Sequence, residues 1–154
     1  MGSSVPLKER WFQDYRPGER FEFGDRLVSA EEIVEFARRY DPQPFHVDAD
    51  AAAQSHFGGL IASGWMSTSL LMCMLCEHFI SPASAMGTAG IDDLRWLRPV
   101  RPGDRVHARV TVVDMRRSKS KPDRGTVTFL QELVNQRGEV VMAMKALSLH
   151  RCRE

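Results

Sequence analysis

The segment YDPQPFHVDAD, residues 40–50, holds the residues best suited to chemistry, Asp41 and His46. Pro42 and Pro44 lie between them, and each proline fixes its own backbone angle and biases its predecessor toward extended geometry. A helix through the segment is therefore excluded, and we expect a stiff turn in which the two side chains converge. A carboxylate and an imidazole directed at one water can remove and return protons near neutral pH. The alternative is an ordinary turn, in which the aspartate precedes a proline and the histidine is a surface or packing residue.

A glycine break follows twelve residues after His46, in the stretch GGLIASGW, residues 58–65. The break leads into a long apolar segment that we expect to be a helix. The unpaired N–H groups at the start of a helix can stabilise a developing oxyanion. The alternative is a helix start of no chemical importance, capped by Ser63.

Helices are predicted in the first half of the chain. Ser29 with Glu32 three residues later forms a capping box, and the following apolar residues repeat at helical spacing until Pro42 ends the helix at Asp41. Asp48 is a good N-cap for a second, short helix that extends through the segment ADAAAQ.

The longest apolar stretch runs over residues 60–80 and is about as long as a membrane span. It contains three serines, a threonine, a glutamate and a histidine, so a buried helix that starts near Ser63 and Gly64 explains it better. Cys73 and Cys76 form a C-x-x-C in the middle of this helix, where burial as small hydrophobes is favoured over a metal site.

Strands are predicted from about Gly90 onward, in the segments IDDLRWL, DRVHARVTVVDM, GTVTFLQELVNQ and EVVMAMKALSLH. Apolar residues alternate with polar ones there, as in half-buried strands, and the expected inward series are Val106, Ala108, Val110 and Val112, then Val127, Phe129 and Leu133. Short connections between long strands favour antiparallel neighbours. The sequence therefore predicts an α+β arrangement in which an antiparallel sheet covers a buried helix.

Composition limits the remaining possibilities. A chain of 154 residues suits one compact domain, residues 1–154. With 21 basic and 20 acidic residues the net charge is +1, which argues against nucleic-acid and membrane partners. Three cysteines, an odd number, and an N-terminus without a visible signal peptide predict a cytoplasmic location.

The segment DPQPFHVDADAAAQSHFGGLIASG resembles the hydratase signature of MaoC-like dehydratases, the (R)-specific enoyl-CoA hydratase group. The resemblance extends to RWLRPVRPGDRVHARVTVV and NQRGEVVM, and so covers the chain from about residue 21 to 150. It implies a hot-dog fold, in which a long helix is wrapped by an antiparallel sheet. It also implies at least a homodimer with active sites near the interface, and chemistry without a metal or redox cofactor, coenzyme A being part of the substrate.

Carried over residue by residue, the resemblance makes Asp41 and His46 the catalytic pair that activates water, and the backbone N–H of Gly64 the oxyanion donor. Two positions depart from the family pattern: Gln43 stands where the family usually has Asn, and Ser63 where it usually has His.

We expect Gln43 and Ser63, together with Phe57, to contact the substrate. The two departures leave the acid–base pair intact and bear on the identity of the acyl group.

The predicted activity is hydration of trans-2-enoyl thioesters, or dehydration of (R)-3-hydroxyacyl thioesters in reverse, on coenzyme A or an acyl carrier protein. Two alternatives remain: a hot-dog thioesterase, which would direct water at the thioester carbonyl, and a non-catalytic acyl-thioester binding protein. The basic loop over residues 116–125 could contact phosphates or an acidic carrier, although a solvated hairpin loop is the favoured interpretation.

Overall fold

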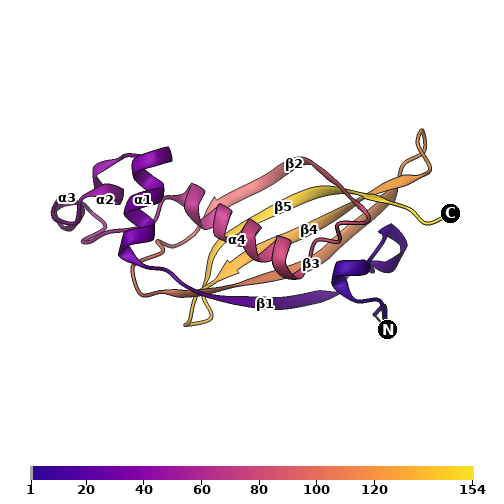
Figure 1. Cartoon of the computed structure of the whole chain (residues 1–154), viewed down its shortest axis with the longest axis horizontal. Coiled ribbons are helices and arrows are strands. Elements are labelled where there is room, and N and C mark those ends of the chain that lie inside the picture. The colour runs from indigo at the N-terminus through magenta and orange to yellow at the C-terminus, as the bar shows by residue number, and fades with distance from the viewer. Residues whose placement is uncertain (1) are drawn as a thin grey trace.

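The computed structural model describes residues 2–154, which form five strands and four α-helices, with two 3-10 turns near the N-terminus (Figure 1). The elements are, in chain order, the 3-10 turns Leu7–Glu9 and Phe12–Asp14, β1 (Arg20–Leu27), α1 (Ala30–Tyr40), α2 (Pro44–Val47), α3 (Ala49–Gln54), α4 (Gly64–His78), β2 (Ala85–Trp96), β3 (Arg105–Arg117), β4 (Arg124–Val134) and β5 (Val140–Arg151).

The strands form one antiparallel sheet in the order β1-β3-β4-β5-β2, so β1 and β2 are its edges. Phe129 in the central strand β4 lies opposite Val112 of β3 and Ala146 of β5. The predicted alternation of β3 and β4 is confirmed, because every residue of the two expected inward series is buried. One face of the sheet is therefore apolar and available for packing.

Helix α4 supplies the other half of the core. Figure 1 shows it lying along the sheet, with α1, α2 and α3 gathered at the end where α4 begins. Five apolar side chains of α4 are buried and belong to the same core cluster as the inward residues of the strands, namely Met66, Leu70, Leu71, Met74 and Leu75. The predicted α+β arrangement of a sheet covering one long helix is confirmed.

The predicted helix starts are also confirmed. Ser29 and Glu32 form the reciprocal capping box of α1, and the Asp48 carboxylate accepts two backbone N–H groups at the start of α3. Ser63 caps α4 by accepting the N–H of Trp65. Each cap satisfies N–H groups that have no partner inside the helix.

Two expectations about local structure were wrong in part. The stiff turn expected to lead to His46 is partly helical, because His46 lies in α2, a single helical turn with Pro44 at its first position, where the missing N–H costs nothing. Strand β2 begins at Ala85, earlier than the alternating pattern from Gly90 indicated, because pairing with β5 extends an edge that is poor in apolar residues.

The expectation that Cys73 and Cys76 are buried was wrong: both are exposed, whereas Cys152 is buried, and all three are free. Helix α4 is apolar around much of its circumference, but the sheet covers only part of it, so both cysteines and part of Met72 are exposed. Among residues 2–154, no group of three or more potential metal ligands occurs, and no helix is long and apolar enough to cross a membrane.

Candidate active site

Asp41 and His46 meet as the sequence predicted, with the Nε2 atom of His46 3.3 Å from Oδ2 of Asp41. His46 is buried, and the Asp41 side chain is 17% exposed. The Nδ1 atom of His46 lies 2.8 Å from the carbonyl oxygen of Ile61. Because a carbonyl only accepts, Nδ1 carries a hydrogen, which leaves Nε2 to face the carboxylate.

The local chain direction explains how the two side chains converge. Asp41 is the C-cap of α1, where its N–H still bonds the carbonyl of Ala37. Pro42 then prevents the helix from continuing, and Pro44 starts the new turn that carries His46. Two short helices that meet at this corner therefore direct the carboxylate and the imidazole toward each other.

The carboxylate of Asp41 is held at both oxygens. Gln43 Nε2 donates to Oδ1 at 2.7 Å, and Ser63 Oγ donates to Oδ2 at 2.7 Å. Burial raises the pKa of Asp41, but the hydrogen bonds from Gln43 and Ser63 and the neighbouring His46 outweigh it, so this pKa lies below its usual value. Gln43 and Ser63, expected to contact substrate, are thus placed on the carboxylate.

Gly64, the expected oxyanion donor, is the first residue of α4. The oxygens of Ser63 accept the N–H groups of the three residues after Gly64, with Trp65 at Oγ and Met66 and Ser67 at the carbonyl. The N–H of Gly64 has no acceptor among residues 2–154. It lies at the positive end of a helix of 15 residues, a position that favours negative charge.

Sequence reasoning missed Trp96 as part of this site. A Cβ atom on Gly64 would lie 2.5 Å from the Trp96 indole, so this ring packs directly on the glycine. The indole Nε1 donates to Thr68 Oγ1 at 3.4 Å, and the ring meets Trp65 edge-on at a centroid distance of 5.0 Å. No spacing pattern relates positions 64 and 96, because the contact depends on how β2 passes α4.

A cavity of about 370 Å³ is lined by His46, Gly64 and Trp96, among other residues. Phe57, expected to contact the substrate, lies in the wall of this cavity, with its ring 5.2 Å from that of Phe45. Arg101 fixes the Phe57 segment by donating from Nη2 to the Phe57 carbonyl at 2.7 Å. The full lining consists of Phe45, His46, Phe57, Ile61, Ala62, Gly64, Ser67, Trp96, Leu97, Arg98, Pro99 and Val100.

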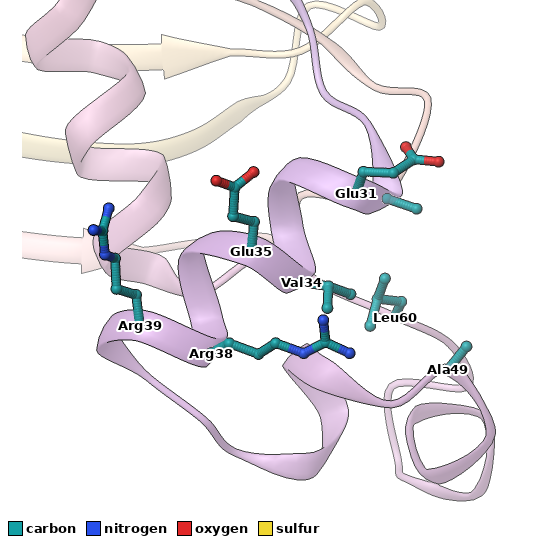
Figure 2. Close-up of a pocket in the computed structure, with 8 residues that line it drawn as sticks. Glu31, Val34, Glu35, Arg38, Arg39, Ala49 and Leu60 are labelled. Atoms are coloured by element: carbon teal, nitrogen blue, oxygen red, sulfur yellow. The ribbon is translucent and has the colours of Figure 1, made fainter.

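A second, larger hollow of about 700 Å³ lies along α1, with Ala49 of α3 and Leu60 also in its wall (Figure 2). Glu31, Glu35, Arg38 and Arg39 surround it with charges of both signs, and Val34 and Leu60 lie between them. It shares no lining residue with the His46 cavity. It holds no histidine or cysteine, so we place the chemistry in the smaller cavity.

Comparison with known proteins agrees with this geometry. The family model described as "MaoC like domain" matches residues 12–134. The chain belongs to the MaoC-like family. A MaoC-like dehydratase from Rhodospirillum rubrum has a similar structure, with a TM-score of 0.87 and 41% identity over 94% of this chain and 99% of that one. The α+β hot-dog fold is therefore confirmed for this member of the MaoC-like family.

Two curated relatives are similar over most of their length. The chain is 29% identical over 128 residues to the (R)-specific enoyl-CoA hydratase of Rhodospirillum rubrum, which covers 82% of this chain and 83% of the relative. It is 27% identical over 124 residues to the uncharacterized protein YdeM of Bacillus subtilis, covering 80% of this chain and 86% of the relative. At the level of the MaoC-like family, these relationships support hydration and dehydration of acyl thioesters.

Proposed function

We propose that this protein adds water to trans-2-enoyl thioesters and, in reverse, dehydrates (R)-3-hydroxyacyl thioesters. The observation that carries the proposal is the Asp41–His46 pair, 3.3 Å apart beside a cavity that also contains Gly64. The similar hydratase of Rhodospirillum rubrum, which is named for this activity, supports the choice of reaction and of its stereochemistry.

The proposed mechanism begins with a water that contacts both His46 Nε2 and the Asp41 carboxylate. Both atoms are acceptors, so a water that donates to each satisfies them together. His46 Nε2 takes one proton from this water as its oxygen attacks C3 of the enoyl group. The Asp41 carboxylate stabilises the imidazolium that forms.

Attack of the water oxygen at C3 moves negative charge onto the carbonyl oxygen of the thioester. We assign the unpaired N–H of Gly64, at the start of α4, to this developing enolate oxygen. The proton taken by His46 then returns to C2 of the enolate, so the net change is addition of H and OH across the double bond. The pair ends in its starting protonation state, because the proton that His46 takes from the water is the one that it returns to C2.

The proposed roles for the other predicted residues follow from their contacts. Gln43 and Ser63 hold Asp41 ionised and oriented, whereas Phe57 forms the wall against the acyl thioester. The mechanism calls for no metal or redox cofactor, and coenzyme A or an acyl carrier would enter as part of the substrate.

We also propose that the protein works as a homodimer. Strand β2 is an edge of the sheet, and large apolar side chains are exposed on it and on the neighbouring face of α4, namely Trp65, Met72, Ile91 and Trp96. A second copy would cover this edge and this surface together. Light scattering should give twice the 17.5 kDa mass of the chain, and a 17.5 kDa particle at micromolar concentration would contradict the dimer.

The test of the activity is a panel of trans-2-enoyl-CoA thioesters of different chain length. Loss of the enoyl-thioester absorbance without release of free thiol is the expected result. Thiol release would identify a thioesterase instead. Tight binding of the thioesters without loss of the enoyl double bond or of the thioester bond would identify a non-catalytic binding protein.

A further inference from the structure

Gln131 breaks the apolar pattern of the central strand β4. It lies in the inward series of that strand, between Phe129 and Leu133, and is 4% exposed. Its side-chain amide makes no hydrogen bond to any of residues 2–154, and its Oε1 atom is fully enclosed without a partner. Burying an unpaired amide costs about 1–3 kcal/mol, and residues that break a local rule in this way are expected at binding sites.

Gln131 lines a cavity of about 420 Å³ between α4 and the inner face of β5 and β2. Met72, Phe79, Phe129 and Ala146 form part of its apolar wall. No acidic side chain, lysine or arginine lies in this wall. The cavity is therefore suited to an uncharged, mainly apolar molecule.

The wall of the cavity extends along the strands. Gln131 lies opposite Met144, whereas His150 in the same wall lies opposite Gly125, six residues further along β4. Six strand residues span about 20 Å, so the two polar residues lie toward opposite ends of a wall that follows the strands. An extended alkyl chain fits such a shape better than a ring system does.

The far end of the cavity is also polar but uncharged. Ser84 Oγ donates to the carbonyl of Arg10 at 2.6 Å, so the 3.3 Å contact between Ser84 and His150 uses the hydrogen of His150 Nδ1. Among residues 2–154, His150 Nε2 is left as an acceptor without a partner. The hydroxyl of Tyr15, whose ring centroid is 5.1 Å from that of His150, also has no partner among these residues.

We propose that this cavity binds an extended alkyl chain that carries one hydroxyl or carbonyl group, which hydrogen-bonds to the amide of Gln131. An amide both donates and accepts, so it matches either group. The bound alkyl chain belongs either to the acyl part of a thioester or to a free amphiphile. This cavity and the His46 cavity both contact α4, which fits the first source, but they share no lining residue, which fits the second.

Two probes of equal chain length test the proposal, 1-octanol and 1-octene. Burial in an apolar cavity alone favours the alkene, because the hydroxyl group must lose its water. A hydrogen bond to Gln131 reverses this order, and we expect 1-octanol to bind roughly tenfold more tightly. Binding is measured from the methyl NMR signal of Met72 in protein labelled at its methionine methyl groups, so the test does not depend on turnover.

Gln131→Met keeps the length of the side chain and removes its polar atoms, and it should restore the preference for 1-octene. Gln54→Met is the matched control, because Gln54 is exposed on α3 outside the cavity, and it should keep the wild-type preference. Tighter binding of 1-octene to the wild-type protein, or no shift of the Met72 signal with either probe, would overturn the proposal. If Gln131→Met does not fold, the order of the two probes on the wild-type protein still decides.

A competition experiment identifies the source of the chain. If 1-octanol raises the KM for an enoyl-CoA thioester without changing kcat, the cavity takes the acyl chain of the substrate. If 1-octanol saturates the Met72 signal while turnover is unchanged, the cavity takes a separate amphiphile.

Discussion

Replacing Ser63 by alanine separates the two tasks that the structure gives to one hydroxyl. Ser63 Oγ donates to Asp41 Oδ2 at 2.7 Å and accepts the N–H of Trp65 at 3.2 Å. Loss of the N-cap should lower the free energy of unfolding by about 1 kcal/mol. Loss of a hydrogen bond to a carboxylate is worth about 1.5–3 kcal/mol, which predicts a decrease of roughly 10- to 100-fold in kcat/KM.

The Ser63→Ala substitution should also shift the pH dependence of turnover in a defined direction. Ser63 is one of the groups that lower the pKa of Asp41, so its removal should raise that pKa. The acid limb of the pH–rate profile for enoyl-CoA hydration should then move to higher pH. Ser63→Thr keeps the hydroxyl and should retain most of the wild-type rate and the original limb.

Ser29→Ala is the matched control for helix capping. Ser29 Oγ accepts the N–H of Glu32 at the start of α1 and has no contact with Asp41. The Ser29→Ala substitution should lower the free energy of unfolding in urea by about 1 kcal/mol and leave turnover unchanged. An unshifted acid limb in Ser63→Ala, or an equal loss of turnover in Ser29→Ala, would refute the assigned role of Ser63.

Three further predictions follow from the same contacts. Burial lowers the pKa of His150 from 6.5 to about 4. As the pH falls, the unfolded chain is protonated at His150 before the folded chain is, so the free energy of unfolding should fall by roughly 3 kcal/mol between pH 6.5 and 4. Urea unfolding of His150→Phe should lose this pH dependence. Gly64→Ala should displace the Trp96 indole, since the new Cβ would lie 2.5 Å from the ring; unchanged tryptophan emission would contradict this contact. Arg101→Met should raise KM roughly tenfold with little change in kcat, because it frees the Phe57 carbonyl, and an unchanged KM would count against it.

Local signals in the sequence were enough to predict much of the fold and the meeting of Asp41 with His46. Prolines at positions 42 and 44 restrict the backbone over a few residues, and the helix caps at Ser29, Asp48 and Ser63 act within one turn. The alternation of β3 and β4 depends on a period of two residues. Each of these features is determined by neighbours in the chain, so no tertiary information is needed to interpret it.

Contacts between distant segments could not be predicted in this way. The hydrogen bond from Ser63 to Asp41 joins residues 22 positions apart, and the packing of Trp96 on Gly64 joins β2 to α4. Both depend on how elements approach in space. The exposure of Cys73 was missed for the same reason, because an apolar helix does not reveal which of its sides the sheet covers.

The central claim, that Asp41 and His46 activate water as one unit, is tested most directly by a double-mutant cycle on enoyl-CoA hydration. We expect Asp41→Asn and His46→Gln each to lower kcat by roughly a thousandfold, and the double variant to be little slower than either single variant. Thioester binding should persist in all three variants. Turnover within tenfold of wild type in either single variant, or fully additive losses in the double variant, would contradict the account.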